Sequence, residues 1–367
     1  MGSMVDKLHR RAFEACIPLS VTLELTLRCN LRCVHCYNFD RDLPYLPLAK
    51  REEELSDAEL HRIVDEVRAE GCLYLALTGG EAMVHPALFD LVAHGVKDGL
   101  VMTVKTNGTL LDEAQAQKLA DAGAAGVEVS LYGASAEIHD GFVKQPGAFA
   151  RTVSGVRAAR AAGLRVKLSF VLVQRNAGEV DRMLALGDEL GVAYGVDPQI
   201  TARYDGSRSS LDLRVDRDTL ARLYRGPLRH LVPSATENPT SAQCACARSV
   251  CGISAFGEVY PCIGAPVPSG SLRRQSFHEV WTTSPALQKI RGLTLDDFPT
   301  CRSCDHLGHC RRSSGVIYAN TGVYTGPAKF GDDWTCMEAE VLHALHDEQP
   351  AESFAPGAST LRRHSRE

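Results

Sequence analysis

The chain has no long hydrophobic run, no excess of positive charge and no secretory signal. None of its apolar runs approaches the ~18 residues that a membrane-spanning helix needs. Its formal net charge is −5, whereas a surface that binds nucleic acid or an anionic membrane needs a basic stripe. The first residues show neither the charged n-region nor the apolar h-region of a signal peptide. These absences predict a cytoplasmic protein that binds neither nucleic acid nor a membrane.

Cysteine, in contrast, is abundant, and its 13 residues fall mostly into three groups. Three lie between residues 29 and 36, four between 244 and 262, and four between 301 and 336. Cys16 and Cys72 stand apart, and we expect structural roles for them. Because disulfides do not persist in a reducing cytoplasm, clustered cysteines there indicate metal or iron–sulfur ligation.

From about residue 20, short apolar runs alternate with longer amphipathic stretches. The pattern predicts strands over 21–27, 73–78, 100–106, 127–131, 165–173 and 192–199. Helices are expected between them, over 56–70, after 86, and over 111–122, 147–162 and 178–190. Strands that each precede a helix form parallel βαβ units, so we expect an α/β fold with a partial TIM-like (β/α)6 barrel. Active sites of such barrels lie at the C-terminal ends of the strands.

The alternation stops near residue 235, and the composition changes there. Residues 234–243 are rich in Ser, Thr, Pro and Asn, and about 100 residues rich in Cys, Gly and Pro follow. The expected organisation is an N-terminal segment (1–17), a barrel (18–233), a mostly irregular cysteine-rich domain (234–345) and a disordered tail (346–367). Metal clusters in place of a large core would hold such a cysteine-rich domain together.

The first cysteine group reads C-x3-C-x2-C and directly follows the first strand. Cys29, Cys33 and Cys36 can hold three irons of a cubane cluster and leave the fourth iron without a protein ligand. An open iron is what a cluster that chelates substrate needs. The alternative is a zinc site with His35 as the fourth ligand, although zinc sites usually show paired C-x2–4-C spacing.

This loop resembles the signature loop of the radical S-adenosylmethionine (SAM) superfamily. One strand–helix unit later, Gly79-Gly80-Glu81 resembles the family segment that meets the amino group of SAM. Asn107 and Ser130, after the third strand and near the end of the fourth, match further SAM-contacting positions. The resemblance implies reductive cleavage of SAM by a [4Fe–4S] cluster. The products would be methionine and a 5′-deoxyadenosyl radical that abstracts a substrate hydrogen.

The C-terminal cysteines resemble a SPASM domain, which follows the barrel in one radical SAM subgroup. This resemblance implies two auxiliary iron–sulfur clusters, [4Fe–4S] in the simplest case. One would use Cys301, Cys304, Cys310 and Cys336, and the other Cys244, Cys246, Cys251 and Cys262. Ser314 stands where the family pattern has a further cysteine, and Cys251 is the expected compensation. The tight C-x-C spacing leaves either Cys244 or Cys246 as a candidate free thiol. Two zinc-ribbon-like sites are the alternative use of the same eight thiols.

Proteins with this architecture mostly modify peptides, so the resemblance implies an oxidative step in ribosomal peptide maturation. Crosslinks, thioethers and C–C bonds are the expected products. A precursor peptide would be the partner. Only about 20 residues precede the first strand, too few for a fused recognition domain, so either a separate recognition protein delivers the peptide or the barrel mouth binds it unaided. Flavodoxin or ferredoxin would donate electrons. The alternatives are oxidation or decarboxylation of a small molecule or tetrapyrrole side chain, peptide epimerisation, and a non-enzymatic cluster- or zinc-binding protein.

Overall fold

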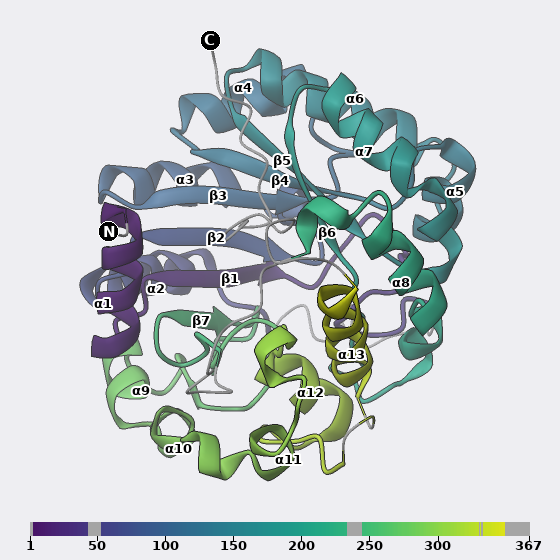
Figure 1. The fold of residues 1–367 in the computed structure, drawn as a ribbon. Helices are drawn as coiled ribbons and strands as arrows, with labels where there is room; N and C mark the ends of the chain where they lie inside the picture. Colours follow the sequence, from purple (N-terminus) through teal and green to yellow (C-terminus); the bar gives the residue numbers. More distant parts are fainter. Residues whose placement is uncertain (1–2, 43–52, 233–243, 330, 332, 349–367) are drawn as a thin grey trace.

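The computed structural model describes residues 3–42, 53–232, 244–329, 331 and 333–348 of the chain. In this part of the chain, nine strands form one sheet in the order β6-β5-β4-β3-β2-β1-β7-β8-β9 (Figure 1). The strands are β1 (Ser20–Thr26), β2 (Tyr74–Gly79), β3 (Val101–Thr106), β4 (Gly126–Leu131), β5 (Arg165–Val171), β6 (Ala193–Asp197), β7 (Val250–Ile253), β8 (Glu258–Tyr260) and β9 (Gly270–Ser271). The strands from β1 to β6 pair in parallel, which confirms the predicted α/β class.

Helices connect the parallel strands and continue through the C-terminal part. They are α1 (Met4–Ala15), α2 (Asp57–Ala69), α3 (Leu88–Lys97), α4 (Glu113–Asp121), α5 (Ala136–Val143), α6 (Ala148–Ala161), α7 (Val180–Glu189), α8 (Arg217–Arg225), α9 (Phe277–Thr283), α10 (Pro285–Gly292), α11 (Pro299–Arg302), α12 (Ser314–Thr321) and α13 (Trp334–Asp347). The predicted capping box of α2 is present. Ser56 Oγ accepts from the Glu59 backbone N–H, and Glu59 accepts from the Ser56 N–H at 2.8 Å.

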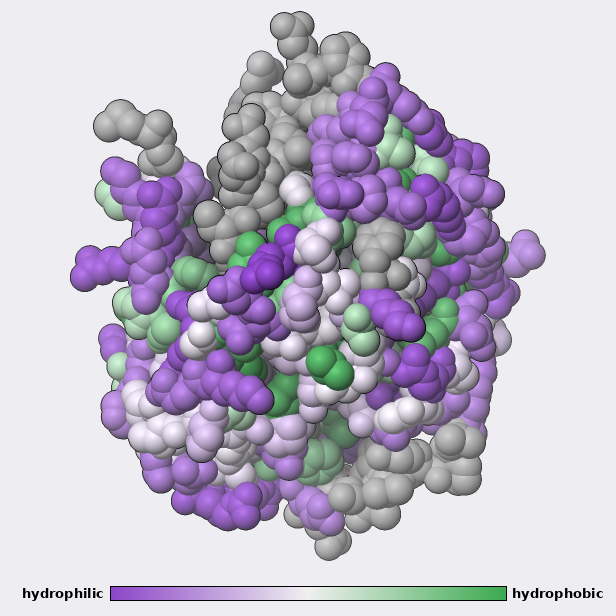
Figure 2. Space-filling model, turned by 60° about the horizontal axis from the view of Figure 1, so that its bottom comes forward, coloured by the Kyte–Doolittle hydropathy of each residue, from purple (hydrophilic) through white to green (hydrophobic). Residues whose placement is uncertain are grey.

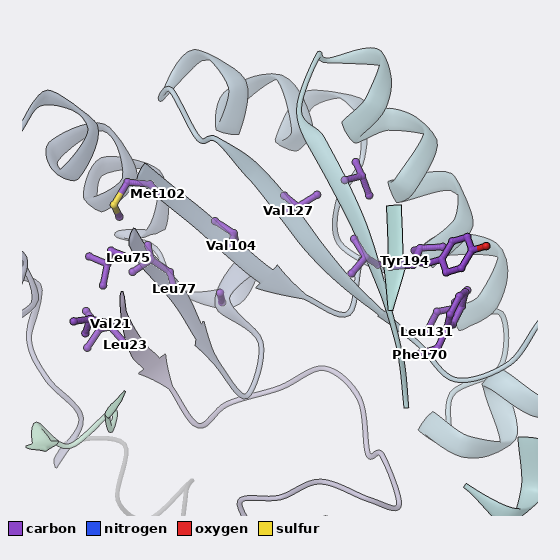
Figure 3. Close-up of a cluster of buried hydrophobic side chains, with 14 of the residues drawn as sticks. Val21, Leu23, Leu75, Leu77, Met102, Val104, Val127, Leu131, Phe170 and Tyr194 are labelled. Atoms are coloured by element: carbon purple, nitrogen blue, oxygen red, sulfur yellow. The ribbon is translucent and has the colours of Figure 1, made fainter. Parts of the chain in front are cut away.

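Alternation along each strand separates an apolar face from a polar one. On the apolar face, Leu23, Leu77 and Val104 are fully buried beneath the helices, and Figure 3 shows such side chains on successive strands. The other face carries polar residues such as Lys105 and Glu128, which line a hollow inside the curved sheet. The strand period of two therefore produces both the core and the lining of the site.

The C-terminal part is joined to the barrel by backbone pairing. Strand β7 pairs in parallel with β1, with Ser20 opposite Val250, and β8 and β9 continue the sheet antiparallel. In Figure 1 this part lies below the barrel, in green to yellow. The sheet thus crosses the expected domain boundary and has β6 and β9 at its edges.

The C-terminal part is also more regular than the sequence predicted. Helices α9 and α10 begin at serine N-caps, Ser276 and Ser284, and Pro285 occupies the first turn of α10. Helix α13 continues two residues into the segment that we expected to be disordered. Residues 349–367 of that segment and the expected linker 234–243 lie outside the described residues.

Few large hydrophobic side chains are exposed among the described residues: Met4, Val5, Leu8, Leu110 and Val323. Figure 2 shows hydrophilic residues around the rim of one face, with small separate patches of hydrophobic residues between them. Among the described residues, no helix is both long and apolar enough to cross a membrane.

Candidate functional site

A cavity of about 250 Å³ opens at the C-terminal ends of the first barrel strands. The loops that follow β1, β2 and β3, together with residues of β4 and β5, form its wall. All the residues that the sequence assigned to the barrel site line this one cavity: Cys29, Cys33, Cys36, Gly79, Gly80, Glu81, Asn107 and Ser130. The structure therefore brings together side chains that are spread over about 100 residues of sequence.

The cysteine loop is fixed by its backbone to the end of α5. The N–H groups of Arg32 and Val34 donate to the last carbonyls of that helix, each at 3.1 Å. Burial raises the pKa of the Cys29 thiol to about 11 and raises that of Cys33 further. Because metals bind the thiolate, iron must displace these protons when it binds.

His35 packs against aromatic rings. Its ring centroid lies 4.8 Å from those of Tyr132 and Phe142, and burial lowers its pKa to about 4. A neutral imidazole in this aromatic pocket is consistent with packing, so the contacts favour a structural role over that of a fourth zinc ligand.

Gly79 and Gly80 allow two backbones to approach each other. A Cβ on Gly79 would lie 2.2 Å from the Thr26 carbonyl oxygen, and one on Gly80 would lie 2.3 Å from that of Arg28. The Gly80 N–H donates to Thr26 O at 2.7 Å. The glycines thus hold the end of β2 against the start of the cysteine loop, in addition to lining the cavity.

Glu81 is buried, 2% exposed, and its carboxylate is held by three donors. Oε1 accepts from Thr106 Oγ1 at 2.7 Å and from the Met83 N–H at 2.9 Å, and Oε2 accepts from the Asn107 N–H at 2.7 Å. Burial raises the pKa of Glu81, and these hydrogen bonds oppose that shift. The carboxylate is therefore pre-positioned on the wall of the cavity.

Asn107 links the end of β3 to the cysteine loop. Its Nδ2 donates to Asn30 Oδ1 at 2.8 Å and lies 4.0 Å from Cys29 Sγ. Thr109 Oγ1 donates to Asn107 Oδ1 and accepts from Asn30 Nδ2, which closes the network. A bound ligand would therefore meet a side chain whose orientation is already fixed.

Two arginines that the sequence did not single out support the cysteine loop. Arg203, which is 6% exposed and follows β6, donates to Val34 O at 2.8 Å and to Cys36 O at 3.2 Å. Arg41 Nε donates to Cys36 Sγ at 3.3 Å. Neither residue belongs to a recognisable motif, and Arg203 is 167 residues from Cys36 in sequence, so only the tertiary fold reveals these contacts.

The barrel interior continues from this cavity toward the C-terminal domain. Glu128 and Ser169 also line a second hollow of about 300 Å³ that reaches Arg311 and Glu338. Glu128 lies 3.1 Å from Lys105 Nζ. Although burial opposes the effect, nearby lysines lower the pKa of Glu128. The two hollows therefore adjoin at Glu128 and Ser169, which line both of them.

Three of the four cysteines proposed for the first auxiliary site lie together. Cys244 Sγ is 3.0 Å from Cys246 Sγ, and Cys246 also contacts Cys262. Ser314 is fully buried beside them, and its backbone N–H contacts the Cys244 sulfur. The position that departs from the family pattern thus belongs to this site.

Cys251 lies in the core, contrary to the expectation that it completes this set. Its thiol is fully buried and donates to Tyr260 O at 3.5 Å. On β7, Cys251 is registered opposite the buried Val21 of β1, so strand alternation directs its side chain into the core. Sequence spacing alone did not show that a short strand begins at Val250.

The cysteines proposed for the second auxiliary site line one small cavity: Cys301, Cys304, Cys310 and Cys336. They come from α11, the turn after it, the segment before α12 and the first turn of α13. Burial raises the pKa of the Cys310 thiol to about 12. Four thiols around one apolar cavity are a donor set that suits an iron–sulfur cluster.

Two family models match the chain. The model of the radical SAM superfamily matches residues 23–186, and that of SPASM, an iron–sulfur cluster-binding domain, matches residues 244–305. The chain belongs to the radical SAM superfamily and carries a C-terminal SPASM domain.

Characterised relatives align over most of the chain. An AdoMet-dependent heme synthase of Methanosarcina barkeri is 31% identical, over 84% of this chain and 94% of its own length. A mycofactocin maturase, MftC, of Mycobacterium ulcerans is 29% identical over 91% and 92%. A PqqA peptide cyclase of Methylocella silvestris is 28% identical over 91% and 94%. The crystal structure of Streptococcus suis SuiB bound to its precursor peptide SuiA shares the fold, with a TM-score of 0.66, 15% identity and coverage of 90% and 79%.

The family defines the cofactors. A radical SAM domain implies a [4Fe–4S] cluster that binds SAM, and the SPASM domain binds auxiliary iron–sulfur clusters. The residues present fit these groups, because three thiols of one loop face the cavity that also contains Glu81. None of the 13 cysteines forms a disulfide, so all of the proposed ligands are available to bind iron.

Proposed function

We propose that this radical SAM enzyme oxidatively modifies a peptide during ribosomal peptide maturation. The observation that carries the proposal is a pair of adjoining hollows, one beside the cysteine loop and one that reaches Arg311 and Glu338, which both have Glu128 and Ser169 in their walls. A peptide side chain placed there would lie between the two cluster-bearing parts of the chain. Relatives named as a maturase and a peptide cyclase support the substrate class.

Each residue set has a separate task in this proposal. Cys29, Cys33 and Cys36 hold the cluster that, with SAM, supplies the hydrogen-abstracting 5′-deoxyadenosyl radical. Gly79, Gly80, Glu81, Asn107 and Ser130 hold SAM; Glu81 offers its carboxylate to the ammonium group. Leu31 and Tyr132, both buried, would shield part of the cavity from water that could quench a radical.

The C-terminal cysteines would hold the clusters that accept the last electron of the substrate oxidation. A substrate that has lost a hydrogen atom must still give up one electron and one proton to become a two-electron oxidation product. We assign acceptance of that electron to clusters held by two groups of thiols: Cys244, Cys246 and Cys262, and Cys301, Cys304, Cys310 and Cys336. A flavodoxin or ferredoxin would reduce the cluster that binds SAM, and a separate protein would deliver the peptide. Cysteines that form no disulfide are typical of the cytoplasm, where we expect the enzyme to act.

The test uses anaerobically reconstituted enzyme with dithionite, SAM and short peptides encoded beside its gene. We expect 5′-deoxyadenosine to form and the peptide to lose two hydrogen atoms in mass. Uptake of one solvent deuteron per peptide without net oxidation would identify an epimerase. The peptide proposal would be contradicted if no peptide stimulated SAM cleavage and no modified peptide formed.

A second candidate is oxidative decarboxylation of a tetrapyrrole side chain, because the heme synthase is 31% identical over nearly its full length. Lys105 and Lys167 line the barrel interior and could pair with propionate groups. Iron coproporphyrin is the matching probe. Loss of CO2 from it, coupled to 5′-deoxyadenosine formation, would replace the peptide proposal.

A further inference from the structure

Four histidines gather beside the second auxiliary cysteine site and have no role in the proposed reaction. His306 and His309 lie in the segment between Cys304 and Cys310, and His343 and His346 lie three residues apart on α13. The ring centroids are 4.6 Å apart for His306 and His343, 4.9 Å for His309 and His343, and 4.6 Å for His309 and His346. Two H-x2-H pairs, distant in sequence, therefore face each other.

The hydrogen bonding of two members points to a ligand. Within the described part of the chain, Nδ1 of His309 and Nδ1 of His343 are buried without a hydrogen-bond partner. The other nitrogen of His343, Nε2, lies 3.4 Å from Asp347 Oδ2. A carboxylate on one ring nitrogen orients the imidazole and raises the basicity of the other nitrogen, which is the usual arrangement around a metal-bound histidine.

We propose that His306, His309, His343 and His346 form a binding site for one borderline transition-metal ion such as Zn²⁺. Imidazole nitrogens bind zinc at about 2.0–2.1 Å, so ring centres around a tetrahedral ion stand about 5 Å apart. The observed separations are close to that spacing. The rings meet edge-on or tilted, at 49–71°, so the imidazoles would have to rotate about their side-chain bonds to turn their nitrogens toward a bound ion.

Such an ion would connect two elements that carry cluster cysteines. His306 and His309 belong to the segment that bears Cys304 and Cys310, while α13 bears Cys336 as well as the other two histidines. The metal would therefore hold the thiols of the second auxiliary site in place from outside the thiol cavity.

The experiment adds Zn²⁺ to the reconstituted holoenzyme under anaerobic conditions, then removes loosely bound ions by dialysis. Zinc and iron are counted per chain, and zinc K-edge EXAFS identifies the atoms around zinc without interference from iron. We expect one zinc per chain with a nitrogen shell that has imidazole scattering. The paired change His309→Gln and His343→Gln should weaken zinc binding more than about 100-fold, and Asp347→Asn about tenfold.

Controls separate this site from other zinc-binding groups. His278→Gln changes an exposed histidine on α9 and should leave zinc binding intact. The surface group Asp65, His94 and Asp98 has its ligand atoms within 4.8 Å of one another, so His94→Gln tests it directly. If the paired variant loses iron, His346→Gln is the milder variant.

Three results would overturn the proposal. A sulfur shell around zinc in the wild-type holoenzyme would place the ion on cysteines. Loss of zinc in His94→Gln would place it on the surface group. Unchanged zinc affinity in a paired variant that keeps its iron would exclude the histidines as ligands.

Discussion

At the residue scale, the barrel site depends on side chains that hold other side chains. The Glu81 carboxylate is oriented by one hydroxyl and two backbone N–H groups, and Asn107 by Asn30 and Thr109. A residue that never touches SAM can therefore change how tightly SAM binds.

We expect Thr106→Val to weaken SAM binding about tenfold. It removes the hydroxyl that donates to Glu81 at 2.7 Å, and a hydrogen bond to a charged group contributes about 1.5–3 kcal/mol. Equilibrium dialysis of SAM against the reconstituted enzyme measures the change, with iron content as the check on the cluster. Thr103→Val, on the same strand, is the matched control. Equal SAM affinity in both variants would contradict the assigned role of Glu81.

We expect Ser314→Cys to alter the first auxiliary cluster. The change supplies a further thiol beside Cys244, and a more negative cluster has a lower reduction potential. EPR-monitored redox titration should show one auxiliary midpoint moving to a more negative value. Thr321→Cys, at the other end of α12, adds an exposed thiol as a control. A titration identical to that of the wild type would place Ser314 outside the cluster's coordination.

Sequence motifs predicted some residues of the site but not others. The barrel cysteines, Glu81 and Asn107 belong to short local patterns, and one cavity contains them all. Arg203 could not be predicted, because its contacts with the cysteine loop exist only once β6 lies in the same sheet as β1. Cys251 was predicted to join the cysteine group, whereas the structure has it among core residues, on a strand of only four residues that spacing alone does not reveal.

At the element scale, the ends of β1 and β2 act as one unit. The two glycines bring the strand end within hydrogen-bonding distance of the residues that start the cysteine loop. The position of the loop therefore depends on a close backbone contact as well as on its own sequence.

We expect Gly80→Ala to destabilise the protein by about 1–3 kcal/mol, as overpacking does, and to deplete iron at the first cluster. Its Cβ would lie 2.3 Å from Arg28 O and 2.5 Å from Leu27 O. Chemical denaturation and iron analysis measure the two effects. Gly178→Ala is the matched control, because a Cβ there meets no described atom within 4 Å. Full iron content in Gly80→Ala would show that the loop tolerates separation from β2.

Periodicity predicted the barrel elements well and the C-terminal ones poorly. Each of the six parallel strands begins and ends within about two residues of its predicted range. Strands β8 and β9 have three and two residues, too few for a period to be recognised, and β7 pairs with a strand 230 residues earlier. Local patterns contain no information about such a distant partner.

At the scale of the whole molecule, two cluster-bearing parts share one sheet, and two adjoining hollows lie between them. We expect about 12 irons per reconstituted chain and about 8 after Cys29, Cys33 and Cys36 are all changed to Ala, since each cubane holds four. Iron and sulfide analysis gives both numbers. Cys251→Ala should retain the full count, because that thiol lies in the core. About 4 irons in the wild type, all lost in the triple variant, would mean that the C-terminal thiols bind zinc or nothing.

The pairing of β1 with β7 also has a consequence for how the chain is made. Ser20 leaves the ribosome long before its partner Val250, and translation at about 5–20 residues per second separates the two by roughly 10–50 s. During that interval one edge of an apolar strand lacks its neighbour, a state that favours pairing with other chains. Expression at low temperature, or with excess chaperone, should therefore raise the yield of folded protein more than stabilising the finished molecule would.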